Sequence, residues 1–282
     1  MSEDPLLFGE RGTAALRQVG GVFAHTFSCD LNRSLASNIS QSVGTERIFL
    51  VAEWRYLAML NYEVDPGLLR PLVPAGTELD CWSGKVFLSL IGFRFLKTRL
   101  FGRLPIPFHS NFDEVNLRFY VRRQEGNELR RGVAFIREIV PRRAIAFVAR
   151  SFYNENYVAL PMRHEIDFRD TGLEVAYSCR STRGWCALRV SVEGDAGDLR
   201  AGSEEQFITE HGWGYSAQRD GGTVEYRVAH PAWRVWRARH PEFSGELTGL
   251  YGKEFACVLS GMPTSALLAE GSEVTVSRGR RL

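Results

Sequence analysis

The sequence predicts a mainly β (α+β) fold, in which an antiparallel sheet or barrel carries one or two packed helices. Strand patterns greatly outnumber helical ones along the 282 residues, and no β-α unit is repeated. Turn signals follow one another closely between the alternating runs, and no internal repeat of fixed period is present. A chain of this length suits one large β-rich domain or two smaller ones.

Residues 1–45 are predicted to be a poorly ordered N-terminal extension. They lack a sustained hydrophobic period and lead into the polar, small-residue run SLASNISQSVGTE, although a short helix is compatible with the pattern from Ala14 to Val22. The domain itself is predicted to span residues 46–282, because the first long apolar run, RIFLVAEWRYLAMLNYEVDP, begins there.

The first elements of the domain alternate strands with turns. A short helical turn is expected after Asp65, followed by a Pro-bounded link and a strand that enters the Ser83-Gly84 turn. VFLSLIGFRFL is a nearly continuous apolar run, typical of a strand buried on both faces. HSNFDEVNLRFYVRR and RRGVAFIREIV flank QEGNE, which predicts a hairpin.

The run PRRAIAFVARSFYNENY changes the period and predicts the clearest helix of the chain. Pro141 suits a first helical turn, and apolar residues recur at helical spacing at Ile145, Val148, Ala149 and Phe152. Further strands are predicted in EVAYSCRS, WCALRVSVEG, GTVEYRVAHP and SEVTVSRG.

The run EQFITEHGWGYS is also predicted to be a strand. Its residues Phe207, Thr209, His211, Trp213 and Tyr215 would share one face, which is more often core than ligand site. Glycines at 212 and 214 mark a bulge or the close approach of another backbone, and they leave a pocket wall open as an alternative.

The strand within NFDEVNLRFYV raises the main functional question. Its apolar face holds Val115, Leu117, Phe119 and Val121, and its polar face holds Glu114, Asn116, Arg118 and Tyr120. The polar face is either a solvated outer face or the inner, ligand-binding wall of a barrel. With His109 in the preceding loop, it offers the carboxylate, guanidinium and imidazole that orient an anionic or carbonyl substrate and transfer protons.

A second polar cluster follows in ARSFYNENY and includes Arg150 and Tyr153. Its alternative interpretation is an ordinary helix C-terminus, where Arg150 interacts favourably with the helix dipole.

Composition and motifs exclude several classes of function. The net charge of +2, without a basic stripe interleaved with aromatic residues, predicts no nucleic-acid binding. No nucleophile elbow, P-loop or dinucleotide fingerprint is present, and the six histidines never stand two together at ligand spacing, so neither metal nor cofactor is predicted. A metal site assembled only in space stays open.

The expected compartment is the cytoplasm. Five scattered cysteines without a C-x-x-C pair fit reduced thiols. No run reaches the length of a membrane span, and the acidic start MSEDPLLFGE lacks the order of a secretory signal.

At this point the residues resemble a known family. The stretches that carry the resemblance are, in order, AEWRYLAMLNYEVDP, VPAGTELD, HSNFDEVNLRFYVRR, RRGVAFIREIVPRRAIAFVAR, YNENY, TEHGWGY, HPAW, YGKEF and PTSALLAEGSEVTV. From Arg47 to Val276 the chain resembles the uncharacterised YqjF-like family, domain of unknown function 2071. That family is grouped with the acetoacetate decarboxylase-like superfamily. The resemblance implies a cone-shaped antiparallel barrel whose interior is the substrate pocket, with helices packed outside, and it favours a homo-oligomer.

The resemblance fails at the signature of acetoacetate decarboxylase itself. In ARSFYNENYVAL, Arg150 matches the arginine of a G-R-E-x-x-G-x-P-K-K-like stretch, but Tyr157 and Val158 stand where the lysines should be. Glu114 matches the acidic residue of the preceding strand. A Schiff base needs an amine that is unprotonated, and Lys85, Lys97 and Lys253 offer no convincing substitute.

The resulting hypothesis is an internal polar pocket for a small carbonyl or carboxylate compound. Arg118 or Arg150 would anchor an anionic group, Glu114 would act as acid or base, and Tyr153 or His211 would complete the wall beside His109, Asn116 and Tyr120. As an enzyme, such a protein would be a lyase or isomerase that forms no covalent intermediate. The alternatives are a non-catalytic binding or sensing module and a purely structural protein with a filled barrel.

Overall fold

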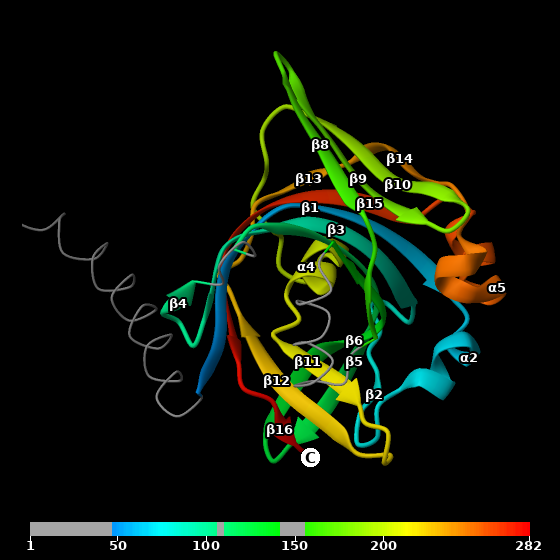
Figure 1. Cartoon of the computed structure of the whole chain (residues 1–282). Coiled ribbons are helices and arrows are strands. Elements are labelled where there is room, and N and C mark those ends of the chain that lie inside the picture. The colour runs from blue at the N-terminus through cyan, green and yellow to red at the C-terminus, as the bar shows by residue number, and fades with distance from the viewer. Residues whose placement is uncertain (1–46, 106–109, 142–155) are drawn as a thin grey trace, which may run out of the picture. The chain divides into compact units, whose positions relative to one another are not determined.

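A closed ring of β-sheet is the central feature of the structure, a computed structural model that describes residues 47–105, 110–141 and 156–282. Hydrogen-bonded neighbours follow one another around the ring in the order β15 (Ser265–Ser277), β1 (Ile48–Val64), β3 (Val86–Leu100), β5 (Phe112–Glu125), β6 (Glu128–Val140), β11 (Trp213–Ala217) and β12 (Thr223–Ala229). β12 then pairs with β15 and closes the ring (Figure 1). The predicted mainly β fold is confirmed.

The ring is a mixed sheet. Most neighbouring strands are antiparallel, as predicted, but β6 runs parallel to β11 and to the short strand β7 (Tyr157–Ala159). A parallel pair needs a long crossover connection. The chain between β6 and β11 provides that connection, and it includes three of the four strands that the structure describes in a second sheet.

Short elements complete the ring. Strands that pair at its margins are β2 (Glu78–Leu79), β4 (Leu104–Pro105), β13 (Val235–Arg237) and β16 (Arg280–Arg281). The predicted helical turn is α2 (Pro66–Leu69), which continues into the 3-10 turn η1 (Arg70–Leu72). Asp65 caps α2, since its carboxylate accepts a hydrogen bond from the Gly67 amide at 2.6 Å.

The hairpin predicted around QEGNE is formed by β5 and β6. Gly126 lies in its turn with φ of 57°, a left-handed conformation that glycine adopts without steric cost. On β5 the predicted alternation also holds: Val115, Leu117, Phe119 and Val121 all lie in one apolar core.

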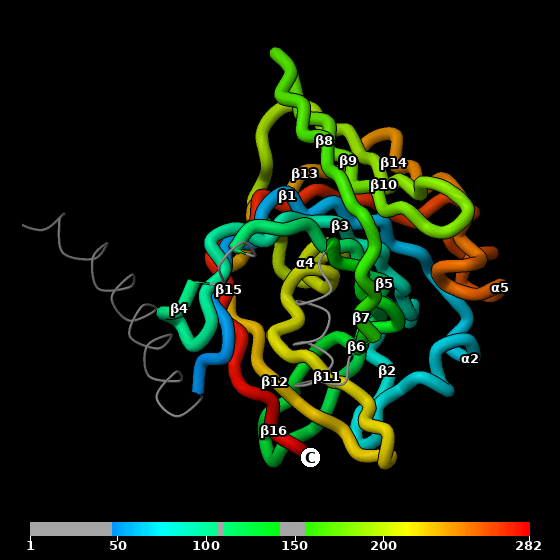
Figure 2. Tube along the Cα trace, in the orientation of Figure 1, coloured from blue at the N-terminus to red at the C-terminus, as the bar shows by residue number. Residues whose placement is uncertain are grey.

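That core lies between the ring and the second sheet, which covers the outer face of β1, β3 and β5 (Figure 2). The second sheet is antiparallel, with the strand order β14 (Arg239–Ser244), β10 (Gly184–Glu193), β9 (Gly172–Ser181) and β8 (Met162–Arg169). Buried Leu60, Leu90 and Leu117 of the ring pack in one cluster with Val175 and Leu188 of this sheet.

Helix α5 (Thr248–Leu259) joins the same core through Leu250, Tyr251 and Leu259. The sequence analysis did not predict this helix. Gly252 interrupts its pattern with φ of 79°, so that two short helical pieces meet at a kink.

The inner face of the ring holds a second apolar core. Met59, Phe87, Ile91 and Tyr120 pack there with Phe207 and Ile208 of helix α4 (Glu204–Thr209). Figures 1 and 2 show α4 within the opening of the ring. The centroids of the Phe207 and Tyr120 rings are 5.1 Å apart.

The prediction of one strand across residues 205–216 is therefore wrong. Phe207 and Thr209 belong to α4, and β11 begins only at Trp213. The helix forms because Ser203 caps it: its hydroxyl accepts from the Gln206 amide at 3.2 Å, and Gln206 in turn accepts from the Gly202 amide at 2.7 Å. At Gly214 it is a side chain and not another backbone that comes close, since a Cβ there would lie 2.2 Å from the Tyr226 ring.

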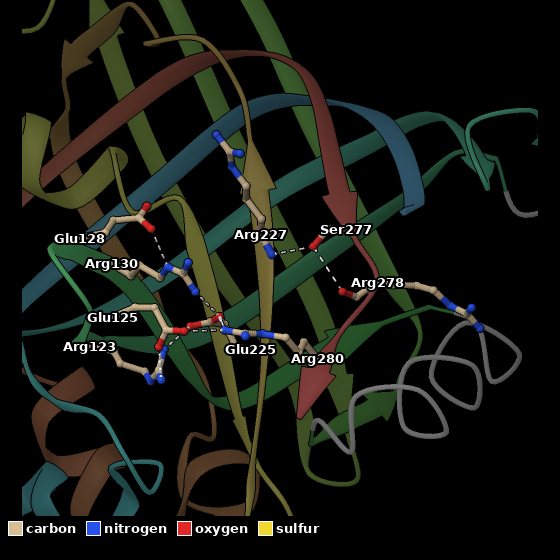
Figure 3. A network of polar contacts seen from close by, with 9 residues as sticks. All are labelled: Arg123, Glu125, Glu128, Arg130, Glu225, Arg227, Ser277, Arg278 and Arg280. Atoms are coloured by element: carbon tan, nitrogen blue, oxygen red, sulfur yellow. Dashed lines mark hydrogen bonds and ion pairs between the residues drawn. The ribbon is translucent and has the colours of Figure 1, made fainter. Parts of the chain in front are cut away.

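Near the closure of the ring, a buried carboxylate forms ion pairs with arginines from several strands (Figure 3). The side chain of Glu225 on β12 is 1% exposed and receives Arg130 at 2.7 Å, Arg280 at 3.0 Å and Arg123 at 3.4 Å. These arginines come from β6, β16 and β5. Beside them, the Ser277 hydroxyl of β15 accepts from the Arg227 amide of β12 at 2.9 Å.

Some predictions lie outside the described residues. These are the extension of residues 1–45, its boundary with the domain, and most of the predicted helix from Pro141 to Tyr157, of which Tyr157 itself lies in β7. In the part of the chain that the structure describes, no helix combines the length and apolar composition needed to cross a membrane.

Candidate functional site

The polar face of β5 lies on the inner side of the ring and is buried. Its residues alternate with the outer-core residues, and Tyr120 belongs to the inner core with α4. The exposed fractions are 3% for Glu114, 3% for Asn116 and 0% for Tyr120, and Arg118 is half-buried. A solvated outer face, the first alternative for this strand, is therefore wrong.

Glu114 is held by two neutral hydrogen-bond donors. The Asn116 side-chain amide donates to Oε1 at 2.9 Å, and the Tyr157 hydroxyl donates to Oε2 at 3.3 Å. Burial raises the pKa of Glu114 to about 7, although the two hydrogen bonds and the charge of Arg118 oppose the shift. At neutral pH this carboxyl group is present in both its protonated and its ionised form.

Arg118 supplies the positive charge nearest to this carboxyl group on the same strand face. Its Nη2 donates to the Ile208 carbonyl oxygen at 3.1 Å, and its guanidinium lies 5.6 Å from the centroid of the Tyr120 ring. Its buried Nε has no hydrogen-bond partner among the described residues, and neither has the Asn116 Oδ1. Both atoms are buried hydrogen-bonding groups without a partner in the described part of the chain.

Tyr120 is part of a buried hydrogen-bond chain. Its hydroxyl donates to Ser89 Oγ at 2.7 Å, because the Ser89 hydroxyl itself donates to Asn61 Oδ1 at 2.7 Å. The Asn61 amide donates to Ser265 Oγ at 3.0 Å, and that hydroxyl donates to Glu204 at the start of α4. This chain of hydrogen bonds fixes Tyr120 and attaches α4 to the ring.

His211 lies next to Tyr120 and is paired with Asp80. The two ring centroids are 4.7 Å apart, and His211 Nε2 is 3.1 Å from Asp80 Oδ2. Burial lowers the pKa of His211 although Asp80 opposes the shift, so the imidazole is neutral at pH 7. Its Nδ1 has no partner among the described residues.

Asp80 is ionised because Arg131 holds it. Arg131 donates to Oδ2 at 2.6 Å and to Oδ1 at 3.1 Å. Burial raises the pKa of Asp80, but the hydrogen bonds from His211 and Arg131 outweigh it and bring the value to about 2. An ionised Asp80 accepts a hydrogen bond from the Nε2–H of His211, so that in the neutral ring Nδ1 carries no proton and is the acceptor.

The structure thus brings together five of the predicted site residues: Glu114, Asn116, Arg118, Tyr120 and His211. His109, Arg150 and Tyr153 lie outside the described residues. Sequence reasoning missed Asn61, Asp80 and Ser89. Asp80 contacts His211 across 131 positions of sequence, and Ser89 sits in an apolar run, so neither left a local signal.

The chain has no lysine on this face. Lys85 pairs with Glu63 at 2.8 Å and Lys97 with Glu53 at 2.6 Å, both on exposed surface, and Lys253 is exposed on α5. Within the described ranges there is also no group of three or more His, Cys, Asp or Glu side chains that could hold a metal ion.

Comparison with protein families and curated proteins identifies a family model and a curated relative of this sequence. The family model DUF2071, described as an uncharacterized conserved protein, matches residues 51–273. The uncharacterized protein YqjF of Bacillus subtilis (strain 168) is 30% identical over 112 residues, which make up 40% of this chain and 45% of YqjF. The match thus spans less than half the length of that relative.

Solved structures share the fold at low sequence identity. Acetoacetate decarboxylase of Legionella pneumophila is 11% identical with a TM-score of 0.59, over 83% of this chain and 87% of the other. An acetoacetate decarboxylase-like enzyme of Sphingomonas wittichii RW1 is 16% identical with a TM-score of 0.55, over 83% and 92%.

A third structure with this fold contains a ligand. The enduracididine biosynthesis enzyme MppR, in complex with the condensation product of pyruvate and imidazole 4-carboxaldehyde, is 12% identical with a TM-score of 0.59, over 82% of this chain and 88% of the other. MppR is also known in complex with pyruvate. At these identities the likeness concerns the fold, and the predicted acetoacetate decarboxylase-like fold is confirmed.

Proposed function

The chain belongs to the DUF2071 family of uncharacterized conserved proteins, and from this premise we propose that it binds a small carbonyl or carboxylate compound inside its ring and acts on it by acid–base chemistry through Glu114. The reaction class is that of a lyase or isomerase. No imine is formed, because all three lysines are on exposed surface and none is near the buried Glu114.

The observation that carries this proposal is the state of Glu114. It is a buried carboxyl group with a pKa of about 7, held in a fixed orientation by Asn116 and Tyr157. A general acid or base is most effective when its pKa lies near the working pH. Asp80, with a pKa of about 2, stays ionised and is unsuited to that role.

The proposed step is a proton transfer next to a carbonyl group. The Glu114 carboxylate takes a proton from the carbon adjacent to the carbonyl, the electron pair of that C–H bond moves towards the carbonyl oxygen, and an enolate forms. The guanidinium of Arg118 stabilises the negative charge that develops, since a fixed charge in a water-poor site costs no reorganisation during the reaction. Return of the proton to another position completes an isomerisation.

The chemistry of the structural relatives supports the ligand class. One of them is an acetoacetate decarboxylase, and another is an enzyme in complex with pyruvate. Acetoacetate and pyruvate are both small oxo acids. The loss of the amine, together with a titratable carboxyl group in the same kind of ring, favours proton transfer over imine chemistry for this chain.

Binding is tested first. Native mass spectrometry of the purified full chain, followed by a thermal-shift screen of small keto, hydroxy and dicarboxylic acids, is applied to wild type, Glu114→Gln and the control Glu242→Gln, an exposed charge change on β14. We expect a ligand-induced shift in wild type and in the control that is weakened or lost in Glu114→Gln. An identical ligand profile in all three proteins contradicts the proposed site.

Proton transfer is tested with the oxo acids that bind. In D₂O, NMR should show wild type and Glu242→Gln replacing hydrogen by deuterium at the carbon next to the carbonyl, and Glu114→Gln should be slower by about 10²-fold or more. Binding without exchange in wild type would instead establish the competing function, a non-catalytic binding or sensing module.

A further inference from the structure

A surface cavity of about 740 Å³ lies between the ring and the turns of the second sheet, apart from the residues of the Glu114 site. Its lining comes from β1, β3, β13 and β15 of the ring, and from the β8–β9 turn and the end of β10. We propose that this cavity binds a small organic cation of the quaternary ammonium class. Its volume falls within the range of roughly 300–1,000 Å³ typical of ligand pockets.

Three aromatic side chains from different elements wall the cavity: Tyr56 of β1, Phe168 of β8 and Trp236 of β13. The centroids of the Tyr56 and Phe168 rings are 6.0 Å apart in an edge-to-face arrangement. Trp236 is oriented by a hydrogen bond from its indole nitrogen to the Gly194 carbonyl oxygen at 2.9 Å. Phe168 is 68% exposed, so its side chain is accessible to a ligand from solvent.

None of these three rings has an arginine or lysine of the described chain over its face. Elsewhere the protein covers its own rings with arginine: Arg130 lies 4.3 Å from the Trp213 centroid and Arg163 lies 4.4 Å from that of Trp185. A cation from solution can therefore take the position that arginine occupies on the other rings.

The charge of the lining favours a cation over an anion. The carboxylates that line the cavity are Glu53, Asp170, Asp195 and Glu270, against the guanidinium groups of Arg55 and Arg169. Both guanidinium groups are already paired, Arg55 with Glu53 at 3.2 Å and Arg169 with Asp167 at 3.1 Å and with Glu174. Two of the carboxylates are paired as well, Glu53 also with Lys97 at 2.6 Å and Glu270 with Arg234 at 3.6 Å. Asp170 and Asp195 form no ion pair with another described residue.

The backbone of β1 places Tyr56 at the cavity. Tyr56 has φ of 54°, in the left-handed region that a tyrosine rarely adopts, and the strand register shifts between Arg55 and Ala58. The Tyr177 hydroxyl fixes this bulge by donating to the Tyr56 carbonyl oxygen at 2.9 Å. The backbone that carries the Tyr56 side chain is therefore fixed before any ligand arrives.

These features together define the chemical class. Aromatic faces attract a cation with diffuse charge and methyl groups, because such an ion is weakly hydrated and loses little on leaving water. The unpaired carboxylates add attraction that salt screens. An aliphatic ligand without charge would gain only the apolar contact.

The test is an NMR titration of the full chain with tetramethylammonium or choline, with 3,3-dimethyl-1-butanol as the neutral analogue of choline and acetate as the anion. We expect saturable binding of both cations, and no saturation by the alcohol or by acetate. Phe168→Leu should weaken cation binding about three- to tenfold. The double variant Asp170→Asn with Asp195→Asn should weaken it at low salt, and the difference should shrink at high salt.

Two controls isolate the cavity. Glu242→Gln changes an exposed charge on β14 outside the cavity and should leave cation binding unchanged. Glu114→Gln should also leave it unchanged, so the test does not depend on the proposed acid–base function. The proposal is overturned by binding of the alcohol as tight as that of choline, by saturable binding of acetate in the cavity, by no saturable cation binding, or by cation binding that neither cavity variant alters.

Discussion

Glu114 and Asp80 are both buried carboxyl groups on the inner side of the ring, yet their pKa values lie at about 7 and about 2. The difference comes from their partners. Asp80 receives two hydrogen bonds from the guanidinium of Arg131 and one from His211, whereas Glu114 receives one from an amide and one from a phenol. The rise in pKa caused by burial is therefore larger than the effect of the partners at Glu114, and smaller than the combined effect of Arg131 and His211 at Asp80.

The raised pKa of Glu114 predicts how stability depends on pH. Between the ordinary value of 4.5 and about 7, the folded state binds this proton and the unfolded state does not, so the free energy of unfolding falls as pH rises through this window. Since a pKa difference of one corresponds to ~1.4 kcal/mol, the contribution of Glu114 to the free energy of unfolding falls by about 3 kcal/mol across this window. Relative to wild type, Glu114→Gln should therefore gain up to about 3 kcal/mol on going from pH 4.5 to pH 8.

Urea unfolding of both proteins at several pH values measures this difference. The comparison cancels the other titrating groups, because wild type and Glu114→Gln share all of them. Parallel stability curves for wild type and Glu114→Gln would mean that Glu114 titrates normally in the folded protein.

Strand pairing near the closure of the ring is held by charge as well as by hydrogen bonds of the sheet. β11 and β12 are short, and the ladder that pairs β12 with β15 joins Val228 to Val276 and Ala229 to Thr275. Glu225 compensates, since it connects its own strand to arginines on β5, β6 and β16 (Figure 3). The charge is needed because three guanidinium groups converge on one point.

Replacing that carboxylate should weaken the closure. Glu225→Gln keeps the shape but leaves Arg123, Arg130 and Arg280 facing one another without their common counter-charge. We expect a loss of about 2–3 kcal/mol in the free energy of unfolding, below the ~3–5 kcal/mol of a fully buried pair. The expected loss is smaller than that of a fully buried pair because 58% of the Arg280 side chain is exposed.

Glu128→Gln is the matched control. Its carboxylate also pairs with Arg130, at 2.9 Å, but it is 57% exposed and has no other role in the network. Its removal should cost at most ~1 kcal/mol. Urea unfolding measures the loss of stability in the two variants. Equal losses would show that burial of Glu225 adds nothing to the strength of its ion pairs.

The molecule as a whole depends on close contact between the ring and the second sheet. Gly92 of β3 makes this contact possible, because a Cβ at that position would lie 2.6 Å from the Tyr177 ring and 2.9 Å from Leu188. Tyr177 cannot move freely, since its hydroxyl is bonded to the Tyr56 carbonyl oxygen across the interface. The same interface also carries the bulge that orients Tyr56 towards the cavity.

Gly92→Ala should accordingly separate the sheets and destabilise the fold by about 1–3 kcal/mol. Chemical unfolding measures the loss, and Gly197→Ala is the control, because a Cβ at Gly197 meets no atom within 4 Å. If both variants are equally stable, the two sheets pack more loosely than the structure indicates.

Much of the architecture could be predicted from local pattern. The alternation on β5, the β5–β6 hairpin, the buried β3 run and the Asp65-capped turn all depend on side-chain period or turn chemistry within a few residues. The wrong strand at residues 205–216 was a local error too, since the Ser203 to Gln206 capping signal was present but outweighed by the aromatic alternation.

The sequence by itself thus determined the mainly β class, the two faces of β5 and the lack of an amine beside Glu114. Only the tertiary structure decided that the polar face is enclosed, because period shows that two faces differ but not what covers each of them. It also decided that Tyr157 meets Glu114 across 43 positions and that Asp80 meets His211 across 131. Such contacts arise from closure of the ring, and burial within that ring is what moves the pKa of Glu114 to about 7.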